Sequence, residues 1–280
     1  MAGGVAAGEV SAESGPSAVV GRFPFGRPAT RRPPRRPSGP AALFVLGVYP
    51  SALHVRWALP GGRGVVGALA VDDEPVVFWD GADADQRIAA WQDVVGWRPE
   101  WGAVGPTGGN GSSGRGVTEH VLTPLGVEPE QAYFTDCLPT FFVKAGRGSQ
   151  GARIHDVYDV FAASTGGPLV PADLPTRPAP RALVNRAVAE ERDVLLAQVA
   201  ESAASTIVTL GQEAADVLTA LTEQSRLVLD TGPRYGRRRS VCIGARHVDW
   251  LALTHPGNRT AAWATRHRQW MADQQHTPLQ

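Results

Sequence analysis

Continuous apolar runs alternate with stretches of helically spaced apolar residues between residues 41 and 274. A continuous run is typical of a strand buried on both faces of a parallel sheet, and spacing of three or four residues is typical of an amphipathic helix. This alternation predicts the α/β class, with a mainly parallel sheet covered by helices on both faces. The predicted strands cover residues 42–48, 65–71, 76–80, 132–137, 205–211, 241–243 and 251–253, and the predicted helices lie around residues 88–95, 154–161, 184–199, 214–221 and 263–270.

Three of the predicted strands end at a corner that carries a polar side chain close to a proline. A proline directly follows Tyr49 and His255, and one follows Asp136 after two residues. Proline cannot continue the hydrogen-bond ladder of a strand, so each strand ends at its corner. The carboxyl ends of parallel strands meet at one edge of the sheet, where open α/β proteins bind ligands. Tyr49, Asp136 and His255 are therefore expected to form one site.

The first 40 residues differ in composition from the rest of the chain, because proline, glycine, serine and alanine dominate them. We predict a disordered basic arm over residues 1–40, one domain over residues 41–274 and a flexible tail over residues 275–280. Such an arm either grips phosphate groups without sequence preference or is a solvated tail. Its arginines are Arg22, Arg27, Arg31, Arg32, Arg35 and Arg36, against only Glu9 and Glu13.

Composition excludes several classes of protein. The 280 residues have a formal net charge of zero, so no global field draws the chain to nucleic acid or to a membrane. Cys137 and Cys242 are too few for a disulfide framework or a four-cysteine iron–sulfur or zinc site. Lys144 is the only lysine, so a Schiff base could form only there or at the N-terminus. The chain has no apolar run of membrane-spanning length and no signal-peptide pattern, so we expect a cytoplasmic protein.

Two further motifs have a simple structural interpretation. The carboxylates of residues 72–74 could hold a metal ion, but a solvated hairpin tip explains them more simply. Residues 109–114 match the pattern G-x-G-x-x-G, yet no strand precedes them and an arginine follows where a lysine is needed, so we predict a flexible loop. His267, between two tryptophans at helical spacing, is expected to pack on a helix face.

Four short motifs, in the expected order, resemble those of the uracil-DNA glycosylase superfamily. Residues 47–51 (Gly-Val-Tyr-Pro-Ser) resemble its first motif, and residues 133–137 resemble the strand whose asparagine reads the uracil edge. Residues 207–214 are similar to the strand–glycine–helix segment before the final motif, which residues 255–259 (His-Pro-Gly-Asn-Arg) resemble. The resemblance spans roughly residues 42–272. It implies a three-layer α/β/α sandwich with a pocket for a flipped base at the carboxyl edge of the sheet.

The resemblance also implies roles for individual residues. His255 would donate a hydrogen bond to the base oxygen, which stabilises the base anion that forms when the N-glycosidic bond breaks. Asp136 holds the position that reads the base, and Arg259 holds that of the wedge that enters the base stack. The other residues expected to bind substrate are Gly47, Pro50, Ser51 and Asn258.

The chain departs from the family pattern at three points. Tyr49 stands where the family usually has Asp, Glu or Asn, and tyrosine, with a pKa of about 10, is a poor base near neutral pH. An ionised Asp136 only accepts hydrogen bonds, so it would suit a base with an exocyclic amine better than uracil. The aromatic side chain that stacks on the base is missing from its usual place, and Phe78 and Trp79 are the candidates to replace it.

The function expected from these patterns is that of a monomeric DNA glycosylase without metal or cofactor. It would hydrolyse the N-glycosidic bond of a flipped base, with non-uracil and modified bases included, and with Tyr49 and His255 as catalytic residues. Two alternatives stay open. One is a non-catalytic protein that binds nucleic acid or nucleotides on the same fold, and the other is a hydrolase of free nucleosides or nucleotides.

Overall fold

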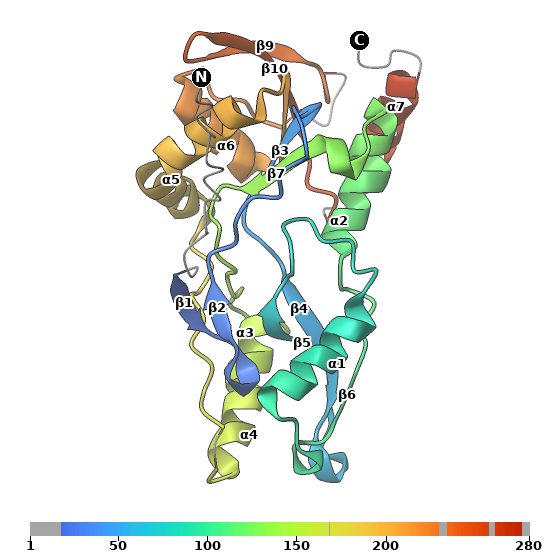
Figure 1. The fold of residues 1–280 in the computed structure, drawn as a ribbon, viewed down its shortest axis with the longest axis vertical. Helices are drawn as coiled ribbons and strands as arrows, with labels where there is room; N and C mark the ends of the chain where they lie inside the picture. The colour runs from blue at the N-terminus through green and yellow to red at the C-terminus, as the bar shows by residue number, and fades with distance from the viewer. Residues whose placement is uncertain (1–17, 168, 230–233, 258–260, 276–280) are drawn as a thin grey trace, which may run out of the picture.

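The computed structural model describes residues 18–167, 169–229, 234–257 and 261–275. Its larger sheet has the strand order β7-β3-β8-β10-β9; the first four strands are parallel, and β9 is antiparallel to β10 (Figure 1). The α/β class and the mainly parallel sheet are thereby confirmed. The strands are β3 (Leu43–Gly47), β7 (Ala132–Asp136), β8 (Thr206–Leu210), β9 (Arg239–Ile243) and β10 (Arg246–Leu253).

Helices pack on both faces of this sheet. Successive side chains of a strand point to opposite faces, so Phe44 and Leu46 face one helical layer while Leu43 and Val45 face the other. Every residue of β3, β7 and β8 is buried, which explains their continuous apolar sequences. The first face is covered by α5 (Pro180–Ser202) and α6 (Gln212–Thr222), and the second by α2 (Ser112–Val117), residues 118–125 and α7 (Ala261–Gln275).

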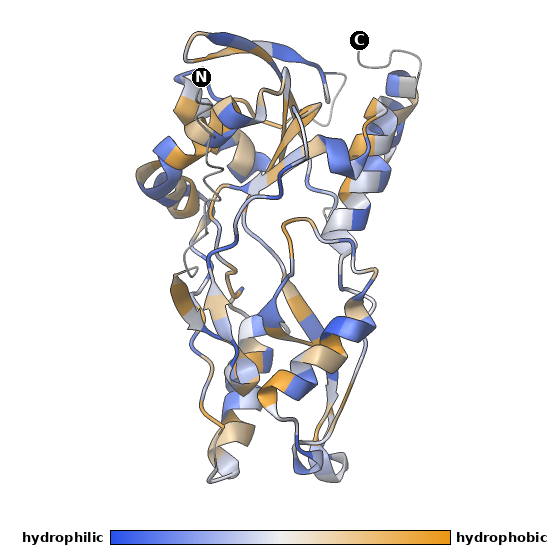
Figure 2. Ribbon diagram, viewed as in Figure 1, coloured by the Kyte–Doolittle hydropathy of each residue, from blue (hydrophilic) through white to orange (hydrophobic). Residues whose placement is uncertain are grey.

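A second sheet, antiparallel and three-stranded in the order β5-β4-β6, lies below the first in Figure 1. It has its own core, in which the ring of Phe25 lies 4.8 to 5.6 Å from the rings of four other aromatic residues. In Figure 2 the central strand β3 of the larger sheet is mainly apolar, whereas the strands of the second sheet and the surrounding helices are mixed. The elements of this part are β4 (Ala52–Ala58), β5 (Val65–Asp73), β6 (Ala103–Gly105), α1 (Ala84–Val95), α3 (Gln150–Ala152) and α4 (Asp159–Ser164).

The prediction of a disordered arm over residues 1–40 is wrong for residues 18–40. β1 (Val19–Arg22) pairs with β2 (Pro28–Thr30), and Phe23 between them is fully buried. Arg35 exchanges two backbone hydrogen bonds of 2.9 Å with Phe134 on the outer side of β7. Residues 1–17 lie outside the described residues. The segment folds because its few aromatic side chains enter the second core, which its overall composition did not indicate.

Four of the six arginines of residues 18–40 form ion pairs within the protein. Residues 18–40 are therefore folded onto the protein, and contact of their arginines with phosphate groups stays a prediction. Their ion pairs are Arg27 with Asp72 at 2.8 Å, Arg31 with Glu191 at 2.7 Å, Arg35 with Glu130 at 3.5 Å and Arg36 with Glu201 at 2.6 Å.

Residues 109–114 do not form the predicted flexible loop, because α2 begins at Ser112 and residues 109–111 form the turn before it. A Cβ atom on Gly111 or Gly114 would overlap the backbone of residues 78–81. These two glycines therefore let α2 approach that turn closely. A Cβ on Gly116 would lie 2.8 Å from the Cβ of Pro256, so the same helix also packs tightly against the corner that carries His255.

Residues 72–80 also differ from the prediction. Glu74 is buried, with 4% of its surface exposed, so it is not at a solvated hairpin tip. Residues 76–80 form a turn in place of the predicted strand. Phe78 in this turn has a φ of 55°, a left-handed conformation that a bulky side chain rarely adopts. The turn brings both Glu74 and Phe78 toward the carboxyl edge of the larger sheet.

Candidate functional site

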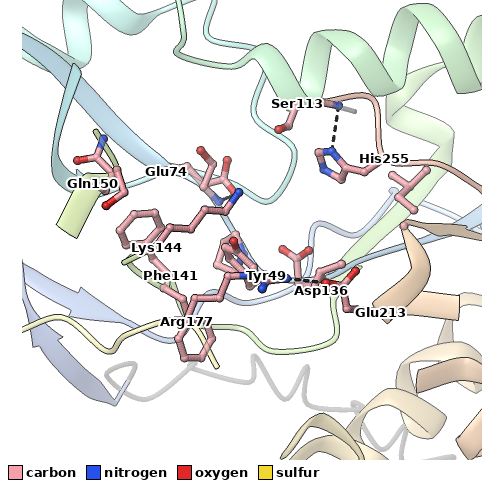
Figure 3. A pocket seen from close by; sticks show the side chains of 18 of the residues that line it. Tyr49, Glu74, Ser113, Asp136, Phe141, Lys144, Gln150, Arg177, Glu213 and His255 are labelled. Atoms are coloured by element: carbon pink, nitrogen blue, oxygen red, sulfur yellow. Dashed lines mark hydrogen bonds and ion pairs between the residues drawn. The ribbon is translucent and has the colours of Figure 1, made fainter. Parts of the chain in front are cut away.

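A cavity of about 750 Å³ lies at the carboxyl edge of the larger sheet, between the two sheets (Figure 3). The three predicted corner residues Tyr49, Asp136 and His255 all line it, so the expectation that they meet is confirmed. Pro50 and Ser51 also line it, as predicted. The second part of the protein and the connecting segments contribute His54, Glu74, Phe78, Ser113, Phe141, Phe142, Lys144, Gln150, Arg153 and Arg177.

Gly47 makes room for Asp136. The two residues are register partners at the ends of β3 and β7, and the backbone N–H of Cys137 donates to the Gly47 carbonyl at 3.1 Å. A Cβ on Gly47 would overlap Oδ1 of Asp136 and lie 2.8 Å from the Phe78 ring. Gly47 does not itself line the cavity. We therefore correct its predicted role from contact with substrate to the placement of the Asp136 carboxyl group.

Asp136 is 5% exposed. Burial raises the pKa of its carboxyl group well above the usual value, and the nearby Glu74 carboxyl raises it further. Both effects favour the protonated form of Asp136. A protonated carboxyl offers one O–H donor and one carbonyl acceptor, as the side chain of asparagine offers a donor and an acceptor. The limit to accepting hydrogen bonds applies only to the ionised form of Asp136.

His255 is held as a neutral hydrogen-bond donor. The backbone N–H of Gly257 donates to Nδ1 of His255 at 3.0 Å, so the ring proton of the neutral form is on Nε2. Burial lowers the pKa of His255, and the positive charge of Lys144 lowers it further, although Glu213 opposes this effect. Near neutral pH the ring therefore presents an Nε2–H donor. A neutral donor of this kind can stabilise an oxyanion on a departing base.

A hydrogen-bond chain fixes the backbone just before His255. The backbone N–H of Thr254 donates to the Tyr235 hydroxyl at 3.1 Å, and that hydroxyl lies 2.9 Å from Nδ1 of His267. Nε2 of His267 lies 2.7 Å from the His120 carbonyl oxygen. His267 is 2% exposed and does not line the cavity, which agrees with its predicted packing role. The chain ties the end of β10 to α7 and to residues 118–125.

Tyr49 forms part of the cavity wall with Arg177. The guanidinium carbon of Arg177 lies 5.6 Å from the centre of the Tyr49 ring, and Arg177 is 2.5 Å from Oε1 of Glu213. Tyr49 also meets the Phe142 ring edge-on at 5.6 Å. Burial raises the pKa of Tyr49 above its already high value, although Arg177 opposes this effect. The phenol therefore stays protonated near neutral pH, which argues against a role as a base.

Glu74 is the site residue that the sequence analysis missed. It lines the cavity, and its Oε1 accepts a 3.0 Å hydrogen bond from the backbone N–H of Ser51 in the first motif. Burial raises the pKa of Glu74 to about 7. The signal was present, because Glu74 follows the apolar run of β5 and directly precedes Pro75, like the polar residues at the other corners. The adjacent carboxylates of residues 72 and 73 favoured the interpretation as a hairpin tip.

Of the two aromatic residues considered for stacking on a base, Phe78 lines the cavity and Trp79 does not. The Phe78 ring lies 5.6 Å from that of Phe134, whereas Trp79 belongs to the second core and donates from Nε1 to Asp83 at 2.7 Å. Asn258 and Arg259, which were expected to bind substrate, lie outside the described residues.

The part of the chain that the structure describes contains no group of three or more His, Cys, Asp or Glu residues placed to hold a metal ion. It also contains no helix long and apolar enough to span a membrane. No protein-family model and no curated protein sequence matches the chain.

Proposed function

We propose that the protein is a DNA glycosylase-like hydrolase that cleaves the N-glycosidic bond of a flipped base, on a three-layer α/β/α sandwich of the uracil-DNA glycosylase type. The observation that carries the proposal is the neutral His255. Its Nδ1 is occupied by the Gly257 N–H, and it lines the same cavity as the buried Asp136. We further propose that the protein acts as a monomer on DNA.

The reaction that this site supports loses a base as an anion. The C1′–N bond breaks, its electron pair goes to the base, and the sugar develops oxocarbenium character. The Nε2–H of His255 would stabilise the negative charge on a base oxygen, and a water molecule would add to C1′. Phe78 would stack on the base while Asp136 contacts its hydrogen-bonding edge.

The protonation of Asp136 widens the range of bases to include uracil. A protonated carboxyl can donate to a carbonyl oxygen and accept from a ring N–H, which is the pattern of uracil O4 and N3–H. An ionised carboxylate would instead repel the carbonyl. We therefore propose a base that presents a carbonyl next to a ring N–H, with recognition that weakens when Asp136 ionises.

Contact with DNA would come from cations around the cavity. Lys144 is exposed and Arg153 is partly exposed, and both line the cavity. Within the described residues, neither forms an ion pair with a carboxylate. Such cations can neutralise phosphates that flank a flipped nucleotide. The arginines of residues 18–40 are not needed for this role.

The test is base release from a panel of oligonucleotides that each carry one damaged or deaminated base, scored by cleavage at the resulting abasic site. We expect release from at least one substrate by the native protein. Loss of one donor to an oxyanion typically slows a reaction about 100- to 1,000-fold, so His255→Ala should lose that factor and keep its fold. His247→Ala, a change in an exposed histidine on β10, is the control.

Each outcome of the panel has a definite meaning. Binding to the oligonucleotides without release of any base would favour the non-catalytic alternative. Hydrolysis of free nucleosides without base release from DNA would favour the other alternative, a hydrolase of free nucleosides or nucleotides. Equal base release by native protein and His255→Ala would remove His255 from the mechanism.

A further inference from the structure

We propose that Glu74 is the general base that activates the attacking water. It would replace the Asp, Glu or Asn that the first motif of the family usually has at the position of Tyr49. The inference rests on the function proposed above. It assigns a catalytic role to a residue from β5 and its following turn, which lies outside all four motifs of the resemblance.

The placement of Glu74 suits this role. Its carboxyl group lines the cavity, and in Figure 3 it lies across the cavity from His255. A base departing toward His255 leaves the opposite face of the sugar open to water, which is the face that Glu74 would serve. The Ser51 N–H holds one carboxyl oxygen at 3.0 Å, so the group is fixed in orientation by the backbone of the first motif.

The other acidic groups of the cavity are less suitable. Glu213 is paired with Arg177 at 2.5 Å. Asp136 sits beside Gly47 at the end of the sheet, where it is expected to read the base, and burial together with the charge of Glu74 favours its protonated form. A protonated acid cannot take a proton from water. Tyr49 is excluded for the same reason, because its phenol also stays protonated.

The surroundings of Glu74 and Asp136 give the two carboxyl groups different pKa values. The anion of Glu74 is favoured by the hydrogen bond from Ser51 and by the charge of Arg32, and it is opposed by burial and by Asp73. Burial and the negative charge of Glu74 both disfavour the anion of Asp136 and so raise its pKa. Two neighbouring carboxyl groups with such different environments can take opposite roles as acid and base. Because the charge of Glu74 raises the pKa of Asp136, Glu74 ionises first as the pH rises and Asp136 keeps its proton longer.

The proposed step balances. The water oxygen forms the new bond to C1′ as the C1′–N bond breaks, and one water proton passes to the Glu74 carboxylate. The products are an abasic sugar with a hydroxyl at C1′ and the base anion, which His255 stabilises. The base then takes a proton from solvent, and Glu74 returns its proton to solvent.

The test is Glu74→Gln in the full chain, measured on a substrate that the native protein cleaves. Glutamine keeps an acceptor oxygen for the Ser51 N–H but cannot take a proton. We expect the single-turnover rate to fall about 100- to 10,000-fold, with the Kd for the oligonucleotide unchanged within about twofold. The rate of the native protein should rise with pH through a group of pKa about 7, and this limb should vanish in the variant. Glu130→Gln, a change in an exposed residue outside the cavity, should leave rate and pH profile unaltered.

A merely structural role would lower stability or affinity without removing the pH limb, and that result would overturn the inference. Native-like turnover by Glu74→Gln would overturn it too while leaving the glycosylase proposal intact. Absence of base release by the native protein across the whole panel would instead overturn the proposed function, and the inference with it. Glu74→Asp serves as a second variant, because a shortened carboxylate should restore part of the rate and the pH limb.

Discussion

The backbone N–H of Gly257 lies 3.0 Å from Nδ1 of His255, at the corner that ends β10. This contact makes Nδ1 an acceptor, so the neutral ring carries its proton on Nε2. The side chain is thereby set as a donor by a residue two positions along the chain, before any substrate is bound.

We expect NMR of protein labelled with ¹⁵N in its histidines to show the Nε2–H tautomer for His255. Its pKa should lie below the usual value of about 6.5, because the ring is buried and faces the charge of Lys144. The signal is assigned by its loss in His255→Gln. Lys144→Gln should raise the pKa of His255, since it removes a positive charge. The Nδ1–H tautomer in the native protein would contradict the arrangement described here.

Replacement of Asp136 by asparagine should change the pH dependence of uracil release. Above the rising limb assigned to Glu74, native release should fall as pH rises further, because the Asp136 carboxyl group loses the proton that it donates to O4. Asp136→Asn should remove this fall, since an amide donates at every pH in the range. Release rates measured from pH 5 to pH 9 decide the point, and identical profiles for the two proteins would show that Asp136 does not read the base.

The same substitution should alter stability in a predictable direction. The pKa of Asp136 is higher in the folded protein than in the unfolded chain, so folding retains a proton that unfolding releases. The stability linked to this proton is complete below the unfolded pKa of about 3.9 and is lost as pH rises toward the folded pKa. Asparagine does not ionise, so the Tm of Asp136→Asn should exceed that of the native protein by more at pH 8 than at pH 5. Asp93→Asn, a change in an exposed residue of α1, should show no such trend.

Gly47→Ala should damage both stability and base recognition. The new Cβ would overlap Oδ1 of Asp136 and press on the Phe78 ring, and overpacking of this kind typically costs about 1 to 3 kcal/mol. Thermal unfolding and Kd for an oligonucleotide substrate measure the two effects. Gly67→Ala is the matched control, because Gly67 lies in β5 with open space around its Cβ position. Equal behaviour of the two variants would show that Gly47 does not set the position of Asp136.

Phe23→Ala should destabilise the protein by about 3 to 5 kcal/mol, because Phe23 is fully buried and truncation of a core phenylalanine leaves a cavity. The Phe23 ring stacks at 5.6 Å on Phe141, which lines the cavity, so removal of the ring should also change the packing of the cavity wall. Chemical denaturation measures the change, with Val19→Ala as the control since Val19 is 66% exposed. A free energy of unfolding equal to that of the native protein would restore the interpretation of residues 18–40 as a solvated arm.

The sequence by itself determined the larger sheet and the convergence of its corners. β3, β7 and β8 are buried along their whole length, so their apolar runs are continuous and can be recognised without knowledge of their neighbours. Parallel strands that end at prolines place Tyr49, Asp136 and His255 at one edge, which follows from chain direction alone.

Only the tertiary structure decided which other groups face the cavity and in what protonation state. Glu74 has the same local pattern as the other corner residues, but the groups that act on its pKa, the Ser51 N–H and the charge of Arg32, come from other segments of the chain. The folding of residues 18–40 likewise depends on contacts of Phe23 and Phe25 with aromatic side chains far along the chain. Composition and periodicity report on neighbours within a few residues. Burial, and with it the pKa of a carboxyl group, depends on what other segments bring to the same place.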